Sequence, residues 1–275
     1  MASQGERALR FKALHERERA FVIPNPWDAG SARLLESLGF EALATTSSGF
    51  ANTLGRLDGE VKLAEKVEHC RALCAVTSLP VSADLENGFG SDPREVAGAI
   101  VQAAAAGVVG ASLEDWGGAE SPVIYEIAQA VERVEAAVEV ARSLPFPFTL
   151  TARAENLLHG HNDLRGTIRR LQAFEAAGAD VLYAPGLRTL EEVRAVVGEV
   201  GKPINVLAPL IPGVTVVDLE EAGARRISLG GALARASLAP LLQASREMLN
   251  QGGFSWAAKA VPGGELAALL TSGDG

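Results

Sequence analysis

The chain has 275 residues, of which 48% are hydrophobic and 21% charged, enough to bury the core of one α/β barrel domain. Its 25 basic and 34 acidic residues give a net charge of −9, which excludes nucleic acid and anionic membranes as expected partners. Residues 1–20 are charged and helical in pattern, unlike a secretory signal, and two cysteines are too few for a disulfide framework. These features predict a cytoplasmic protein.

The elements alternate in type along the chain. A helix outside the main fold is expected over residues 1–20, and a glycine-punctuated extension with one more helix and a loose end over residues 251–275. Between them, helices are expected for example over residues 92–106, 124–143, 164–177 and 190–200. The expected strands cover residues 21–24, 42–47, 80–85, 110–114, 148–153, 181–184, 203–207 and 226–229.

Eight strands separated by helices predict parallel pairing, because parallel neighbours need crossover connections. The count favours a closed (β/α)₈ TIM barrel over an open doubly wound sheet. No G-x-G-x-x-G follows the first strand, which argues further against a dinucleotide fold. We therefore expect a single domain over residues 1–275, with the barrel spanning residues 21–250.

Acidic residues gather where the expected strands end, which is where barrels carry their sites. Asp84 and Glu86 close the third strand two positions apart, and Glu114 closes the fourth. Burying such acids is costly unless they are paired or bind a cation. Oxygen ligands without a Cys or His cluster predict a hard cation, Mg²⁺ or alternatively Mn²⁺. Arg153 ends the fifth strand and offers a fork that can grip a substrate carboxylate.

Two other acids near these loops have a structural interpretation. Asp92 precedes Pro93, and Asp163 precedes a helical run, so both are expected to cap the helices that follow them. His159 and His161 form an H-x-H pair after the fifth strand. With no further metal ligand nearby, we expect a loop with a substrate contact rather than a metal pair.

The remaining histidines and the cysteines are assigned from the helices that carry them. His15 and His69 lie in charged helical segments and are expected to be solvated. Cys70 and Cys74 are four positions apart on one helix and are expected to be ordinary packing residues.

Five segments in chain order resemble the isocitrate lyase/phosphoenolpyruvate mutase superfamily: NPWDAGSARLLESLGFEALATTSSGFANTLGRLDGE, PVSADLENGFG, GASLED, TARAEN and ISLGGALARASL. The resemblance spans residues 21–249 and implies a (β/α)₈ barrel. It also implies a homo-oligomer, a tetramer or a dimer, whose last barrel helix is exchanged between subunits. The reaction it implies stabilises the enolate of a small 2-oxo acid on Mg²⁺ while a C–C or P–C bond is made or broken.

The resemblance also implies a metal site. Asp84 would bind Mg²⁺ directly, and Glu86 and Glu114 would act through bound water. The superfamily more often has Asp where this chain has Glu86, so the carboxylate here stands one methylene farther from the backbone.

Substrate contacts are implied in the same way. Ser47, Ser48 and Gly49 would donate hydrogen bonds to the substrate carboxylate. Arg153 would bind the oxo-acid end, and Asp58 would lie close to both metal and substrate. The candidate catalytic residues are then Asp58, Glu114 and Arg153.

The segment after the fourth strand limits which reactions of the superfamily are expected for this chain. It reads EDWGGAESPVIYEI and lacks the Lys-Lys-Cys-Gly-His type of segment that isocitrate and methylisocitrate lyases carry, which argues against isocitrate cleavage. Trp116 stands where phosphoenolpyruvate mutase has a Lys, which argues against a mutase or phosphonopyruvate hydrolase activity; these two activities are the alternative to C–C cleavage. Decarboxylation of an oxaloacetate-like acid, or cleavage of a substituted malate-like acid, needs little beyond the shared core. Gly117 and Gly118 predict a lid over residues 116–125.

Two further classes stay open. SLGGALARA after the eighth strand is similar to the glycine turn that binds phosphate in many barrels, which favours a phosphate-ester isomerase or aldolase, yet no Schiff-base Lys ends a strand. A non-catalytic metabolite-binding barrel is the other alternative, although a scaffold has no reason to keep uncompensated acids at its mouth.

Overall fold

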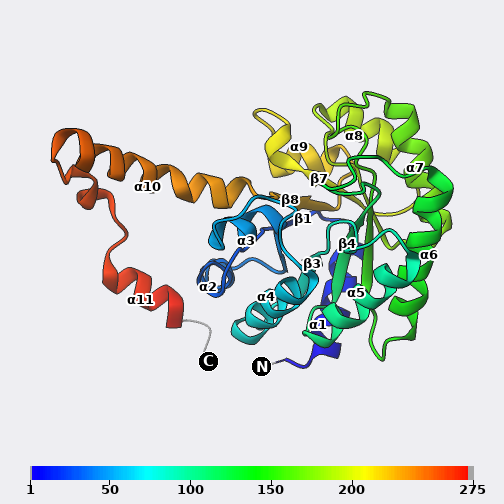
Figure 1. Cartoon of the computed structure of the whole chain (residues 1–275), viewed down its shortest axis with the longest axis horizontal. Helices are drawn as coiled ribbons and strands as arrows, with labels where there is room; N and C mark the ends of the chain where they lie inside the picture. The colour runs from blue at the N-terminus through cyan, green and yellow to red at the C-terminus, as the bar shows by residue number, and fades with distance from the viewer. Residues whose placement is uncertain (1, 272–275) are drawn as a thin grey trace.

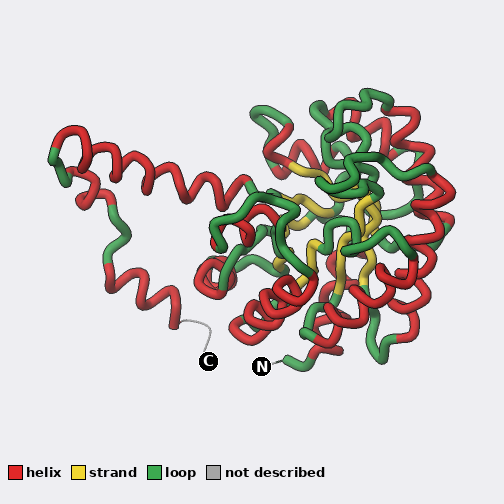
Figure 2. The backbone as a smooth tube through the Cα atoms, in the orientation of Figure 1, coloured by secondary structure: helices red, strands yellow, loops and turns green. Residues whose placement is uncertain are grey.

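The computed structural model describes residues 2–271, which form eight parallel strands surrounded by helices (Figures 1 and 2). Each expected strand is present, with ends that differ by no more than a few residues. The strands are β1 (Phe21–Ile23), β2 (Leu43–Ala44), β3 (Val81–Asp84), β4 (Gly110–Glu114), β5 (Thr149–Arg153), β6 (Val181–Tyr183), β7 (Ile204–Leu207) and β8 (Arg226–Ser228).

The sheet order is β1-β8-β7-β6-β5-β4-β3-β2, so β1 and β2 are the two ends of the ladder. Backbone and side-chain hydrogen bonds join these ends. The Ala44 amide donates to the Pro24 carbonyl at 3.1 Å, and Asn25 Nδ2 donates to the carbonyls of Ala44 and Thr45, both at 3.2 Å. Asn25 Oδ1 in turn accepts from two amides that follow β8, each at 2.9 Å. The sheet is therefore a nearly closed barrel, which confirms the predicted (β/α)₈ fold.

Helices alternate with the strands and cover the outside of the barrel (Figure 1). The predicted caps are confirmed: Asp92 accepts from the Arg94 amide at 2.8 Å and Asp163 from the Gly166 amide at 2.9 Å. The helices are α1 (Gln4–Glu16), α2 (Ala29–Ser37), α3 (Ser47–Thr53), α4 (Leu63–Val76), α5 (Pro93–Ala105), α6 (Ile127–Ser143), α7 (Leu164–Ala176), α8 (Leu190–Val197), α9 (Val216–Glu221), α10 (Ala232–Gln251) and α11 (Gly263–Thr271).

Helix α1 closes the amino-terminal end of the barrel. Phe11 is fully buried there with Phe21 and Val109 in an apolar cluster. The expectation that His15 is solvated is wrong, because its ring lies edge-on to Phe11 and Phe21 at centroid distances of 4.7 and 5.0 Å. Burial, reinforced by the nearby Arg226 charge, lowers the pKa of His15 to about 3, so the imidazole is neutral.

The same correction applies to His69, which is also buried. It stacks on Phe50 of α3 at 3.8 Å, and its Nε2 lies 2.9 Å from the Trp27 carbonyl oxygen. The charged pattern of α4 hid this contact, since the pattern does not reveal which face a neighbouring helix covers. Cys70 and Cys74 are free and buried in the core, as predicted for packing residues.

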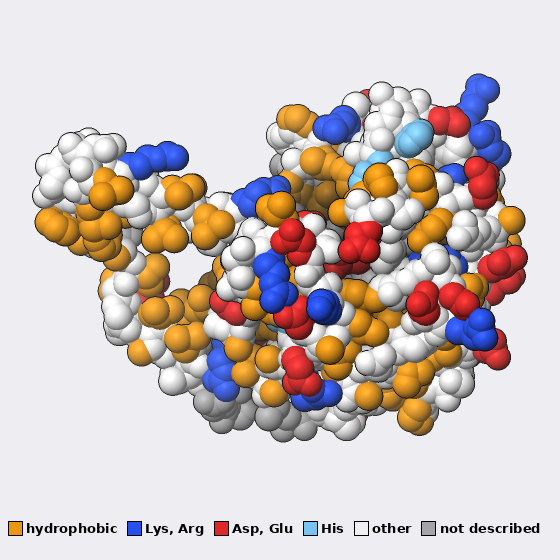
Figure 3. All heavy atoms as spheres, viewed as in Figure 1, with side chains coloured by type: hydrophobic (Ala, Val, Ile, Leu, Met, Phe, Trp, Pro, Cys, Tyr) orange, Lys and Arg blue, Asp and Glu red, His pale blue; other side chains and the backbone are white. Residues whose placement is uncertain are grey.

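Helix α10 extends away from the barrel, and α11 returns to pack on α2 (Figure 1). Arg33 of α2 donates to the Leu270 carbonyl of α11 at 2.8 Å. Leu241, Leu242 and Leu249 of α10 are exposed, and apolar side chains gather along this arm (Figure 3). The helix expected within residues 251–275 is present, whereas the loose end falls on residues 272–275, outside the described part. Among residues 2–271, no helix is both long and apolar enough to cross a membrane.

Candidate active site

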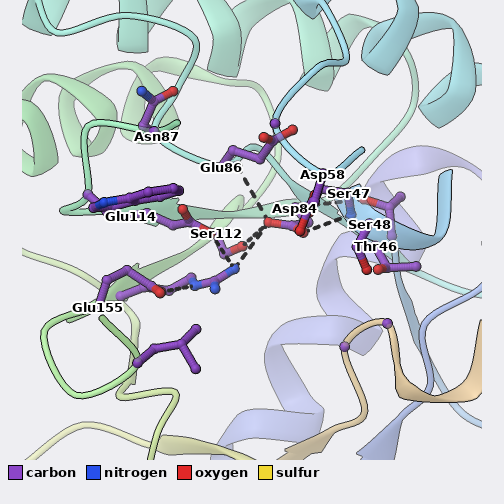
Figure 4. A pocket seen from close by; sticks show the side chains of 18 of the residues that line it. Thr46, Ser47, Ser48, Asp58, Asp84, Glu86, Asn87, Ser112, Glu114 and Glu155 are labelled. Carbon is purple, nitrogen blue, oxygen red and sulfur yellow. Dashed lines mark hydrogen bonds and ion pairs between the residues drawn. The ribbon is translucent and has the colours of Figure 1, made fainter. Parts of the chain in front are cut away.

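A cavity of about 1590 Å³ opens at the carboxyl ends of the strands. It gathers side chains from loops that lie far apart in the sequence (Figure 4). Of the eight residues predicted to bind metal or substrate or to take part in catalysis, seven line it: Ser47, Ser48, Asp58, Asp84, Glu86, Glu114 and Arg153. The remaining one, Gly49, lies buried behind this wall.

Arg153 is the centre of the charge network. Its Nη1 lies 3.2 Å from Asp84 Oδ1 and 2.9 Å from Glu114 Oε1, and its Nε lies 2.7 Å from Glu155 Oε1. Burial opposes its charge, but Glu114, Glu155 and Asp84 outweigh that penalty and hold the Arg153 pKa well above its ordinary value. Its guanidinium also lies 4.9 Å from the centre of the Tyr183 ring. In this structure the Arg153 guanidinium forms ion pairs with acids at the ends of three neighbouring strands.

Asp84 lies between the α3 and β4 sides of the cavity (Figure 4). Its Oδ2 accepts from the Ser47 amide at 3.0 Å, and its Oδ1 faces Arg153 and the Ser112 hydroxyl. Burial raises its pKa, but the charges of Arg153 and Lys66 and the bonds from Ser47 outweigh burial and leave the pKa below its usual value. Asp84 is therefore an ionised carboxylate at neutral pH.

The other acids differ from Asp84. Burial raises the pKa of Glu86 to about 7, although the nearby charge of Lys66 lowers it. Burial also raises the pKa of Asp58, although a hydrogen bond from the Ser47 side chain lowers it. Burial also raises the pKa of Glu114 well above its usual range, despite Arg153. The Arg and Lys side chains of the cavity thus do not fully offset the cost of burying its carboxyl groups, and a bound cation would lower that cost.

The donor set fits Mg²⁺ as one direct carboxylate assisted by others. Within residues 2–271, no group of three or more His, Cys, Asp or Glu side chains is arranged to hold a metal ion by itself. Mg²⁺ commonly keeps several waters and takes only one or two carboxylates, so a closed cage is not required. Glu86 Oε1 is buried, and no described residue hydrogen-bonds to it. Glu86 also has a φ of +50°, an uncommon conformation for a residue with a side chain. These features favour a free oxygen that faces a metal-bound water.

The Ser47–Gly49 turn begins α3, with Thr46 as its cap. The Gly49 amide donates to Thr46 Oγ1 at 3.2 Å, so this N–H is already used within the helix. A Cβ at Gly49 would lie 2.5 Å from Thr46 Cγ2, which explains the glycine sterically. Since the Ser47 amide faces Asp84, Ser48 is the member whose polar groups are left to face the cavity. The donor role expected for Gly49 stays a prediction that this geometry does not favour.

Comparison with known proteins identifies the family of the chain. The family model described as phosphoenolpyruvate phosphomutase matches residues 11–249. The chain belongs to that family. The match confirms the resemblance to the isocitrate lyase/phosphoenolpyruvate mutase superfamily that the five sequence segments indicated.

Three relatives show how similar this phosphomutase-family chain is to proteins already described. A solved protein of Burkholderia cenocepacia J2315, provisionally assigned as a lyase/mutase, is 51% identical with a TM-score of 0.94, covering 98% of this chain and 96% of that one. The oxaloacetate decarboxylase of Paraburkholderia xenovorans (strain LB400) is 31% identical over 71% of this chain and 66% of its own length. A structure of oxaloacetate acetylhydrolase with the product oxalate is 26% identical, with a TM-score of 0.86, covering 99% and 95%.

Several residues around the family site were not singled out from the sequence. Lys66 of α4 is fully buried, no described residue hydrogen-bonds to its Nζ, and its charge lowers the pKa of Asp84 and Glu86. Lys66 stands four positions before Cys70 and seven before Leu73, so helical spacing places it on the buried face of α4 and was the available signal. Asp115 accepts from the Glu155 amide at 2.7 Å and pairs with Arg170 at 3.1 Å. The Glu-Asp pair that ends β4 was the available signal for Asp115.

The segment over residues 116–125 borders the outer part of the cavity in this phosphomutase-family member. Trp116 and Ile124 form an antiparallel bridge, and the Gly117 amide donates to the Val123 carbonyl at 2.8 Å. Trp116 stacks on His159, with ring centroids 4.1 Å apart. His159 therefore lines the cavity, whereas His161 does not. A lid movement of this segment remains a prediction.

Proposed function

We propose that this protein is a Mg²⁺-dependent lyase that cleaves a C–C bond next to the carbonyl of a small 2-oxo or substituted dicarboxylic acid through an enolate. The observation that carries the proposal is Asp84, which stays ionised despite burial, beside Arg153 and Glu114 at the mouth of a barrel of this family. Relatives named as an oxaloacetate decarboxylase and an oxaloacetate acetylhydrolase support a small oxo acid as the substrate class.

Asp84 would hold the metal directly, with Glu86 and Glu114 acting through water. Bound Mg²⁺ supplies a Lewis acid for the negative charge that develops as the bond breaks. Arg153 would turn part of its fork from Glu114 or Asp84 to the substrate carboxylate once the metal neutralises those acids. Ser48, at the start of α3, would donate to the other end of that carboxylate and hold it in plane with the carbonyl.

Asp58 is the candidate for proton transfer. It lines the cavity on the loop between α3 and α4, and burial raises its pKa toward the range that suits a general acid or base. A hydrogen bond from Ser47 fixes its position. For a malate-like substrate, Asp58 would take the proton of the substrate hydroxyl as the C–C bond breaks and return it to the carbon of the enolate. For decarboxylation, Asp58 would pass on a proton taken from solvent, and neither route needs a cysteine.

C–C cleavage is favoured over P–C chemistry by the segment after β4. The residues from Trp116 to Tyr125 contain no Lys or Arg that could hold a phosphoryl group. A phosphoenolpyruvate mutase or phosphonopyruvate hydrolase reaction is the second candidate, supported by the family match alone.

Turnover of four acids, each with Mg²⁺ and with EDTA, tests the proposal: oxaloacetate, phosphonopyruvate, 2-methylisocitrate and 2,3-dimethylmalate. Pyruvate release is measured for all four, together with oxalate formation from oxaloacetate and phosphoenolpyruvate formation from phosphonopyruvate. Turnover of a C–C substrate that stops on chelation is the expected result. Turnover of phosphonopyruvate alone would favour the second candidate. If none of the four acids is turned over but Mg²⁺ raises the melting temperature, a non-catalytic metabolite-binding barrel would be favoured.

The projecting arm supports a homo-oligomer, which we propose exchanges α10 between subunits. Leu241, Leu242 and Leu249 leave an apolar face exposed along a helix that extends away from its own barrel. Light scattering after chromatography should give a dimer or tetramer, and Leu241→Asp should lower the mass toward a monomer. A wild-type monomer at micromolar concentration would contradict this proposal.

A further inference from the structure

Two aromatic rings form the outer wall of the cavity directly above the charged site. Trp116 follows Glu114 by two positions, and His159 follows Glu155 by four, and all four side chains line the cavity. The indole and imidazole rings are 4.1 Å apart and within 19° of parallel. The rings are stacked face to face, so each covers one face of the other and only their outer faces and edges are left to meet a ligand.

Backbone contacts on the Trp116 side hold this wall in place. The segment that carries Trp116 is closed by its bridge to Ile124 and by the Tyr125 amide, which donates to the Asp115 carbonyl at 2.8 Å. A surface fixed in this way can bind a flat group without first losing the entropy of ordering its rings.

The wall is also neutral and has apolar neighbours. Partial burial lowers the pKa of His159, and the charge of Arg153 lowers it further, so the imidazole is uncharged at pH 7. Leu158, Leu207 and Leu210 line the same cavity. The cavity volume of about 1590 Å³ exceeds the roughly 300–1,000 Å³ of pockets for drug-sized ligands, far more than a four-carbon acid fills.

We propose that Trp116 and His159 bind an apolar, planar substituent on the carbon next to the carbonyl, so that the substrate is an aryl- or alkenyl-substituted 2-oxo acid or malate rather than a bare four-carbon acid. This inference rests on the proposed function, because the metal and Arg153 anchor the acid end. The flat substituent then stacks on the outer face of the Trp116 indole, whose other face His159 covers, while the bond to be cleaved stays at the charged end.

Binding of oxamates tests the proposal without turnover. Oxamate, N-benzyloxamate and N-(carboxymethyl)oxamate present the same carboxylate and carbonyl but differ in the attached group. In calorimetric titrations with Mg²⁺, we expect N-benzyloxamate to bind at least about tenfold more tightly than oxamate, since aromatic stacking and burial both favour it. The carboxymethyl compound should gain nothing, because it places a charge against a neutral wall.

Substitutions in the segment over residues 116–125 test whether Trp116 provides the extra affinity for the benzyl group. Trp116→Ala should remove the benzyl preference while oxamate affinity changes by less than about twofold, and Trp116→Phe should keep most of the preference. Val123→Ala, on the same segment and also lining the cavity, is the matched control and should keep all of it. A preference that survives in Trp116→Ala, or equal affinity of the wild type for oxamate and N-benzyloxamate, would overturn the inference.

Oxalate separates this inference from the function on which it rests. If oxalate with Mg²⁺ does not raise the melting temperature, the proposed oxo-acid site fails, and the substituent site falls with it. If oxalate binds and the benzyl group adds nothing, the oxo-acid site stands and only the aromatic wall loses its assigned role.

Discussion

The two ends of the barrel are built from the same strands but serve opposite purposes. At the amino end, α1 seals the barrel with Phe11, and even His15 is held neutral among aromatic rings. At the carboxyl end, Asp84 and Glu114 are buried as acids around Arg153. The closed end gains stability from apolar contact, whereas the open end keeps costly charge next to a cavity.

This difference predicts which property of the protein a substitution at each end should change. A change at the closed end should alter the free energy of unfolding far more than the chemistry, because the acids and Arg153 lie at the carboxyl ends of the strands. A change at the open end should alter metal or substrate binding with little loss of stability, since buried acids contribute poorly to stability. Substitutions at the two ends should therefore have separable effects on stability and on activity.

Asp84→Ala should give the largest effect. It removes the carboxylate that is ionised despite burial, so Mg²⁺-dependent turnover of any identified substrate should fall by at least about 10³-fold. Cooperative unfolding, followed by circular dichroism, should persist. Leu54→Ala, an exposed apolar change near the same mouth, is the control and should keep full activity. An active Asp84→Ala enzyme would remove Asp84 from the metal site.

Phe11→Ala should destabilise the protein without touching the chemistry. Loss of a fully buried phenylalanine costs about 3–5 kcal/mol of unfolding free energy through the cavity it leaves. Leu9→Ala, on the exposed face of the same helix, should cost less than about 1 kcal/mol. Denaturant titration measures both values. A Phe11→Ala variant as stable as wild type would show that α1 does not seal the barrel.

Arg153→Lys should impair substrate binding by about 100-fold in KM, because the ammonium keeps the charge but loses the fork that reaches three acids and the substrate. Steady-state kinetics at saturating Mg²⁺ measures this change. Arg142→Lys, in an exposed pair with Asp180, is the matched control and should leave KM unchanged. Unaltered KM in Arg153→Lys would place Arg153 outside the substrate site.

His15 makes the closed end sensitive to acid. Its pKa is about 3 in the folded protein against about 6.5 unfolded, so between these values the unfolded chain binds more protons and stability falls as pH falls. Between pH 6.5 and pH 5 this loss is about 2 kcal/mol for one such histidine. His15→Phe should lessen the acid loss by about that amount in denaturant titrations, whereas exposed His161→Phe should not change it. An identical pH profile in His15→Phe would show that His15 is not buried as a neutral ring.

Much of the open end was predictable because it depends on order along the chain. Parallel strands carry their carboxyl ends to one mouth, so acids that end successive strands must meet there. Asp84, Glu86, Glu114 and Arg153 can therefore be grouped from their positions in the sequence alone. The caps at Asp92 and Asp163 were equally local, since a cap depends on the few residues around it.

Contacts between elements that are distant in sequence could not be predicted from the sequence and are seen only in the tertiary structure. His15 and His69 have charged neighbours along the chain, yet aromatic rings from other elements cover them. The stack of Trp116 on His159 joins loops after β4 and β5, and no local pattern encodes that meeting. The sequence by itself determined which residues share a strand end or a helix face. Packing decided which of those faces are covered, because burial depends on the shape and chemistry of whatever lies opposite.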